Sequence, residues 1–175
     1  KELLKQWAAA KNGPEKDEAR KKLEAMDAAA LQATIRSFNP SRPASETATG
    51  VQEFMLHFPD GHSRTFYVDV PEGYDPAKSY SLVIALHGGV SGGGYDTGKQ
   101  AVTFYWSDLL GEKKGDFIIA GPSAMCPQTT QEARWWRIKG MQNILYLIKS
   151  LKGVYNINDN KVFVNGHSDG GSGTY

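Results

Sequence analysis

The final stretch of the chain, from Lys161 to Tyr175, constrains the fold more than any other part of the sequence. It reads KVFVNGHSDGGSGTY. Its β-branched and aromatic start is typical of a buried strand, and this run leads directly into a match to the pattern G-x-S-x-G. A serine in a sharp turn from strand to helix has a strained backbone, so the positions two residues away must lack side chains. The pattern therefore predicts that Ser168, between Gly166 and Gly170, is lifted off the end of a strand.

A second apolar run ends in another glycine motif. Tyr80 to Leu86 (YSLVIAL) also has the composition of a buried strand, and it is followed by His87-Gly88-Gly89-Val90, which we call the HGG loop. The loop and the glycines after it contain neither Gly-Lys-Ser/Thr nor the spacing G-x-G-x-x-G, so nucleotide binding is not indicated. Glycines suit a loop whose backbone N–H groups approach a ligand closely. We therefore expect the HGG loop to line a ligand site.

The rest of this region alternates between strand and helix patterns. Apolar residues alternate in the predicted strands and recur with helical period in the predicted helices. The expected elements are a hairpin of 51–58 with 63–70, helices over 100–110 and 138–151, a strand over 117–120 and a turn over 156–160.

With both motifs at strand ends and in this order, the chain resembles the α/β-hydrolase superfamily. More closely, it is similar to the esterases and peptidases grouped with polyhydroxybutyrate depolymerases, feruloyl esterases and dienelactone-hydrolase-like enzymes. The resemblance covers residues 51–175. It implies an α/β fold with an antiparallel first hairpin and then parallel strands with flanking helices, of which this chain contains the N-terminal part.

The resemblance also implies acyl-transfer chemistry. Ser168 is expected to be the nucleophile. The backbone N–H groups of Asp169, Gly89 and Val90 are expected to form an oxyanion hole. The other residues expected beside the substrate are His87, Gly88 and His167.

Two adjacent tryptophans, Trp135 and Trp136, are candidates for contact with the substrate. Neighbouring side chains point in different directions on a regular element, so one indole can pack while the other faces the cleft. An exposed indole suits stacking on sugar or aromatic rings. The alternative is that both indoles lie in the core.

The general base and its carboxylate are not evident in the sequence. In this superfamily they follow the serine, as Asp or Glu and then His. Seven residues follow Ser168; none is His, and the only acid is Asp169, which adjoins the nucleophile. His87 and His167 belong to the two motifs. We expect the acid, the base and further strands to lie in a remainder of the hydrolase polypeptide. Residues 1–175 are expected to be inactive alone. The strand before Ser168 is then expected to form an apolar edge of their sheet.

The first 38 residues are expected to form a helical extension. One apolar stripe runs from Glu15 to Phe38, and Asn12-Gly13-Pro14 breaks the pattern before it. We expect an amphipathic cap on the hydrolase domain, with a docking or dimerising hairpin as the alternative. The Pro- and Ser-rich segment 39–50 predicts a linker between this extension and the domain of residues 51–175.

Composition excludes several other classes. A net charge of +1 gives no electrostatic case for nucleic acid. No apolar run is long enough for a membrane span. His57 and His62 share no ligand spacing with other residues, so no metal and no cofactor are expected. The single cysteine, Cys126, is expected to be a bystander thiol, and it leaves the compartment open; a secreted or periplasmic location is favoured.

The functional prediction is a serine esterase that cleaves small-molecule or polysaccharide-linked carboxylic esters. A serine peptidase of the prolyl-oligopeptidase type is the alternative within the same fold. A non-catalytic pseudo-hydrolase that serves as a binding protein is the alternative from another class.

Overall fold

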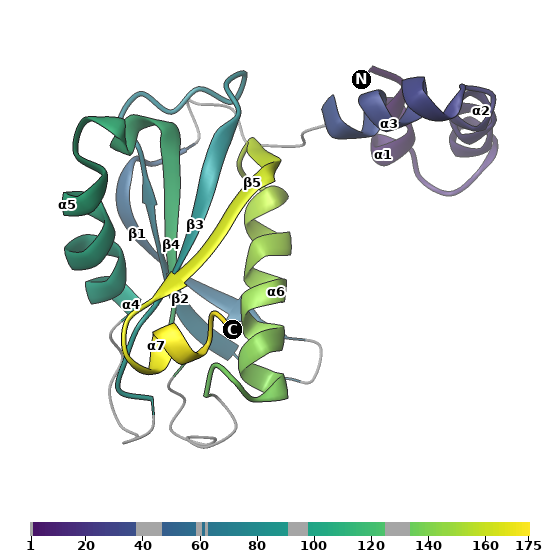
Figure 1. The fold of residues 1–175 in the computed structure, drawn as a ribbon. Coiled ribbons are helices and arrows are strands. Elements are labelled where there is room, and N and C mark those ends of the chain that lie inside the picture. The colour runs from purple at the N-terminus through teal and green to yellow at the C-terminus, as the bar shows by residue number, and fades with distance from the viewer. Residues whose placement is uncertain (1, 38–46, 59–60, 62, 91–97, 125–133) are drawn as a thin grey trace. The chain divides into compact units, whose positions relative to one another are not determined.

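The computed structural model describes residues 2–37, 47–58, 61, 63–90, 98–124 and 134–175 (Figure 1). The chain divides into two compact units, Lys1–Pro40 and Ser41–Tyr175. Each unit is considered by itself.

Over residues 2–37, the N-terminal unit forms three helices. They are α1 (Glu2–Ala9), α2 (Pro14–Glu24) and α3 (Ala28–Ser37). The break before Pro14 was expected, but the single stripe from Glu15 to Phe38 was a wrong prediction, because α2 ends at Glu24. The side chain of Asp27 accepts a hydrogen bond from the backbone N–H of Ala30 (2.9 Å), which caps the start of α3.

The larger unit is built on a five-stranded mixed sheet with the order β1-β2-β4-β3-β5. The strands are β1 (Gly50–His57), β2 (Ser63–Val70), β3 (Tyr80–Leu86), β4 (Phe117–Pro122) and β5 (Ile157–Gly166). Strands β1 and β2 pair antiparallel, as do β2 and β4, whereas β3 pairs parallel with both β4 and β5. The predicted antiparallel hairpin followed by parallel strands is confirmed.

Strand β5 begins earlier than the sequence suggested. The run Asn156 to Asn160 was predicted as a turn, but the strand starts at Ile157, which is buried and pairs with Tyr80. The register shifts between this pair and the next one, Leu82 with Val162. The turn-forming asparagines lie within this irregular part of the pairing.

Helices cover both faces of the sheet (Figure 1). Helix α6 (Ile138–Lys152) packs its buried residues, such as Leu147, against one face. The other face is covered by α4 (Gly98–Gln100), a π-helical turn (Ala101–Trp106) and α5 (Ser107–Leu110), followed by a 3₁₀ helix (Gly111–Asp116). Strand β3 has no exposed residue: Leu82, Ile84 and Leu86 face α6, while Val83 and Ala85 face the other layer. A strand buried on both faces reads as a continuous apolar run, which is why it was recognised.

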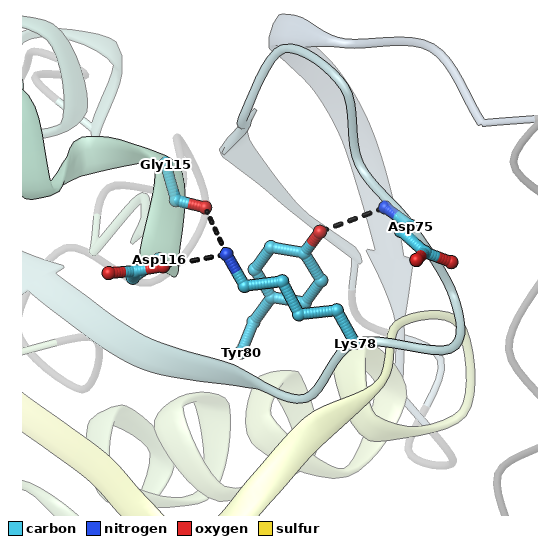
Figure 2. A network of polar contacts seen from close by, with 5 residues as sticks. All are labelled: Asp75, Lys78, Tyr80, Gly115 and Asp116. Carbon is cyan, nitrogen blue, oxygen red and sulfur yellow. Dashed lines mark hydrogen bonds and ion pairs between the residues drawn. The ribbon is translucent and has the colours of Figure 1, made fainter.

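A polar network fixes the end of the sheet where β3 and β4 begin (Figure 2). The ammonium group of Lys78 lies 2.6 Å from the carboxylate of Asp116 and 3.5 Å from the carbonyl oxygen of Gly115. The hydroxyl of Tyr80 accepts a hydrogen bond from the backbone N–H of Asp75 (2.8 Å). These contacts hold together the loops that precede the two strands. The two motifs lie at the opposite end, where the parallel strands finish.

Strand β5 forms one edge of the described sheet, as expected. It carries apolar side chains that are partly exposed, with Phe163 at 50% and Val164 at 39%. Among the described helices, none combines the length and the apolar character that a membrane span requires.

Candidate active site

The serine of the G-x-S-x-G motif lies in a sharp turn between a strand and a helix. Strand β5 ends at Gly166, and the short helix α7 (Asp169–Ser172) begins directly after Ser168. The backbone of Ser168 has φ 55° and ψ −121°. Within the described part of the chain it is the only residue other than glycine with positive φ. Its side chain is exposed. The chain therefore holds a hydroxyl group at the tip of a strained turn.

The two glycines of the motif are required by close backbone packing. A Cβ atom on Gly166 would collide with the backbone of Gly170, and a Cβ atom on Gly170 would collide with the carbonyl group of Leu86. The turn therefore folds back on itself and presses against the end of strand β3. This is the physical reason for a glycine two positions away on each side of Ser168.

The HGG loop lies beside Ser168. A methyl group built on Gly88 would lie 3.1 Å from the Cβ atom of Ser168 and 3.6 Å from its Oγ atom. The backbone N–H of His167 donates a hydrogen bond to the carbonyl oxygen of Leu86 (3.4 Å). Gly89 adopts φ 77°, in the left-handed region that favours glycine. The structure thus brings together two motifs that are about 80 residues apart in the sequence.

The side chain of His87 lies inside the protein, although the sequence suggested that this residue lies beside the substrate. It is 1% exposed. Its Nε2 atom accepts a hydrogen bond from the backbone N–H of Ala124 (3.0 Å), so the proton lies on Nδ1, which is 2.7 Å from the carbonyl oxygen of Gly88. Both ring nitrogens are used in holding the backbone. His87 is therefore a structural residue of the HGG loop and is not placed to act as a base.

Trp135 is also buried, which agrees with the expectation that at least one of the two adjacent indoles packs. It is 0% exposed, and its Nε1–H group donates a hydrogen bond to the carbonyl oxygen of His87 (2.8 Å). The His87 and Trp135 rings meet edge to face, with centroids 5.1 Å apart. Trp136 is half-buried, packs against the main core, and has the guanidinium group of Arg134 5.8 Å from its ring centroid. No contact described for Trp136 joins it to Ser168.

The hydrogen bond between Trp135 and His87 was not anticipated from the sequence. A signal for it lies in Gly173, where an added Cβ atom would collide with the Trp135 side chain. The glycines after Ser168 therefore allow close packing against Trp135 as well as the turn itself. Two other predicted residues lie where the motifs meet: Asp169 opens α7 next to Ser168, and Val90, at the end of the HGG loop, is 1% exposed.

Of His57, His62 and Cys126, only His57 lies in the part of the chain that the structure describes. His57 is exposed on β1, with its Nδ1 atom 2.8 Å from the hydroxyl of Ser63. His62 and Cys126 lie outside the described residues. Within the described part of the chain, no group of three or more His, Cys, Asp or Glu side chains is arranged to hold a metal ion.

Comparison with known proteins finds similarity in structure. No protein-family model matches the chain, and no curated protein matches it. A thermostable esterase superposes with a TM-score of 0.57 at 24% identity, over 71% of this chain and 36% of the esterase. A ferulic acid esterase superposes with a TM-score of 0.53 at 18% identity, over 71% of this chain and 52% of that enzyme.

A peptidase shares the same architecture. Dipeptidyl peptidase 4 of Porphyromonas gingivalis superposes with a TM-score of 0.53 at 12% identity, over 86% of this chain and 20% of the peptidase. The chain therefore spans about half of the length of these structures or less. The sheet order, the flanking helices and these similarities show that the chain has the α/β-hydrolase fold, of which the described sheet makes up a part.

Proposed function

We propose that this chain is the nucleophile-bearing part of a serine hydrolase that cleaves carboxylic esters through an acyl-enzyme. The observation that carries the proposal is the meeting of the two motifs. Ser168 occupies a strained, exposed turn, and the HGG loop lies against its side chain. A nucleophile elbow beside an oxyanion-forming loop is the arrangement that acyl transfer needs.

The reaction would begin with attack by the Oγ atom of Ser168 on the ester carbonyl carbon. The carbonyl oxygen becomes an oxyanion, which the backbone N–H groups of Asp169, Gly89 and Val90 would stabilise. A general base takes the serine proton and gives it to the leaving alcohol as the carbon–oxygen bond breaks. Water then hydrolyses the acyl-serine with the same base and the same oxyanion hole.

The base and its carboxylate are proposed to come from polypeptide other than these 175 residues. Of the four histidines, His87 is buried and bonded to backbone through both ring nitrogens. His57 is exposed on β1, and His167 directly precedes the nucleophile. The partner required for activity is therefore the remainder of the hydrolase polypeptide, and residues 1–175 alone are expected to be inactive.

The proposed substrates are small-molecule or polysaccharide-linked esters. Two of the structures that share this fold are a thermostable esterase and a ferulic acid esterase, which favours ester substrates, including feruloylated ones. The similarity to a dipeptidyl peptidase favours a second candidate, a serine peptidase that uses the same Ser168. The half-buried Trp136 remains a candidate contact for a substrate ring.

A substrate panel on the full-length protein separates these activities. The panel consists of a short-chain aryl ester, a methyl ferulate and a dipeptide anilide, each compared with Ser168→Ala. We expect the wild-type protein to turn over esters and Ser168→Ala to show no turnover. The unfolding midpoint of the Ser168→Ala variant should lie near that of the wild type. Anilide cleavage without ester cleavage would favour the peptidase. Turnover that persists in Ser168→Ala would remove the nucleophile assignment, and no turnover on any substrate would favour a non-catalytic binding protein.

A further inference from the structure

Trp135 is the point at which three elements around Ser168 meet. Its indole donates a hydrogen bond to the HGG loop and packs against Gly173 directly after helix α7, and its backbone packs against Gly140 of helix α6. We propose that Trp135 is a positioning residue, which sets the distance between the HGG loop and Ser168 through its Nε1–H group. This inference rests on the proposed function, since the loop it positions is the proposed oxyanion loop.

The hydrogen bond from Trp135 acts on a peptide group that controls the loop. The indole N–H donates to the carbonyl oxygen of His87 (2.8 Å), at the first residue after strand β3. A peptide bond is planar, so holding this carbonyl also fixes the direction of the Gly88 N–H. The same carbonyl lies against α7, because a Cβ atom on Gly170 would come within 3.0 Å of it. The peptide is therefore held between the indole and the helix that follows Ser168.

Two glycines pack closely against Trp135, one against its side chain and one against its backbone. A side chain on Gly173 would collide with Trp135, and its Cβ atom would lie 2.9 Å from the indole Cγ. A Cβ atom on Gly140 in α6 would collide with the backbone of Arg134 and lie 3.0 Å from the Cα of Trp135. Helix α6 and the residue after α7 therefore approach Trp135 without intervening side chains. A displacement of Trp135 would be transmitted to the turn that carries Ser168.

His87 holds the same loop from its other side. Its Nδ1 atom lies 2.7 Å from the carbonyl oxygen of Gly88, and its Nε2 atom accepts from the N–H of Ala124, just after strand β4. Its ring also packs edge to face on the Trp135 indole. Together the two side chains connect the HGG loop to Ala124 after β4 and to Gly173 after α7. Gly88, where an added Cβ atom would lie 3.6 Å from the Oγ of Ser168, is then left with little freedom.

The N–H group of Trp135 can be removed with little change in shape. Replacing Trp135 by benzothienylalanine substitutes a sulfur atom for the N–H and keeps the bicyclic ring; Trp135→Phe is the genetically simpler variant. Tyr74→Phe is the matched control. Tyr74 is buried, and its hydroxyl accepts a hydrogen bond from the backbone N–H of Asn156 (2.9 Å), at the other end of the sheet. The control also loses one buried hydrogen bond to backbone, but far from Ser168.

The first measurement is amide hydrogen exchange of the full-length protein at Gly88, Gly89 and Val90. We expect exchange there to become about tenfold faster in both Trp135 variants, as for the loss of one hydrogen bond, and to stay unchanged in Tyr74→Phe. Unchanged exchange in the benzothienylalanine protein would overturn the proposal, whatever the activity.

The second measurement is the rate constant for labelling Ser168 with a fluorophosphonate. We expect it to fall about tenfold or more in the Trp135 variants, because small displacements of oxyanion donors lower the rate strongly. Tyr74→Phe should label at the wild-type rate. An equal fall in the labelling rate constant of Tyr74→Phe would refute a positioning role. Labelling of the Trp135 variants at the wild-type rate, despite faster exchange in the loop, would refute it too. A wild-type protein that never labels would refute the proposed function instead, and exchange would still decide whether Trp135 holds the loop.

Discussion

Ser168 is held in a backbone conformation that its side chain disfavours. Its φ of 55° lies in a region where residues other than glycine are uncommon. Such strain persists when the surrounding packing requires it, and here Gly166, Gly170 and Leu86 pack against one another around the turn. The strained backbone of Ser168 therefore costs stability, and it places the hydroxyl group at the tip of the turn.

Relieving this strain should stabilise the protein. We expect Ser168→Gly to raise the free energy of unfolding by about 1 kcal/mol, because glycine adopts positive φ without steric cost. Ser168→Ala keeps a Cβ atom and should change it by less than about 0.5 kcal/mol. Urea unfolding followed by tryptophan fluorescence measures both. A destabilised Ser168→Gly would show that the turn is not strained.

Gly170 should be intolerant of even one added methyl group. We expect Gly170→Ala to lower the free energy of unfolding by about 3 kcal/mol, because its Cβ atom would collide with the Leu86 carbonyl group. Gly115→Ala is the control. Its φ is not positive, and a Cβ atom there would meet nothing within 4 Å, so the change should stay within about 0.5 kcal/mol. Similar losses in both variants would contradict the packing described for the motif.

The helices and strands that carry one clear sequence pattern, such as an apolar run or a motif, could be predicted from the sequence. Strand β3 is a continuous apolar run, and the G-x-S-x-G motif follows the end of β5. The start of β5 could not be predicted in this way, because its asparagines favour turns, whereas pairing with β3, with a shift in register, keeps them in the strand. The start of α3 depends on a single cap, Asp27, inside a continuous helical pattern.

For the site, the sequence located the motifs but not the roles of the side chains around them. Ser168 and the HGG loop could be placed because each follows a strand. The burial of His87 and Trp135 depends on contacts with Ala124 and with Gly173, which lie 37 and 38 residues away from them in the sequence. Nothing in the local pattern distinguishes a tryptophan that faces a cleft from one that supports it. Tertiary packing decides between them.

The network of Figure 2 should make a small contribution to stability that depends on pH. The hydrogen bond between Lys78 and Asp116 lowers the pKa of the Asp116 carboxyl below 3.8 and raises the pKa of the Lys78 ammonium above 10.5. A lowered carboxyl pKa gives stability that is present above the unfolded-state value and is lost as the pH falls through the folded-state value. The raised ammonium pKa gives stability that is lost as the pH rises through its folded-state value.

A double-mutant cycle of Lys78→Met and Asp116→Asn tests this pH dependence. Both groups are exposed, so we expect only a small favourable coupling at about pH 7, which is lost as the pH falls through the lowered folded-state pKa of Asp116. Thermal unfolding of the four proteins over a series of pH values measures the coupling. A coupling that survives in acid would show that charge is not its cause.

At the scale of the whole molecule, the chain has a partial α/β-hydrolase fold, and the proposed reaction needs more polypeptide. The chain spans 36% of the esterase and 52% of the ferulic acid esterase that share its fold. The larger unit holds the proposed nucleophile and the proposed oxyanion loop, in which both ring nitrogens of His87 are bonded to backbone. Activity is therefore a property expected of the full-length protein.

Labelling of the full-length protein with a fluorophosphonate tests the central claim most directly. The reagent requires an activated serine and an oxyanion hole, but no knowledge of the natural substrate. We predict stoichiometric labelling that peptide mapping locates at Ser168 and that is absent from the Ser168→Ala variant. The intact mass of the labelled protein should include the polypeptide that supplies the base. Labelling at another residue, or no labelling of the folded full-length protein, would contradict the assignment of Ser168 as the nucleophile.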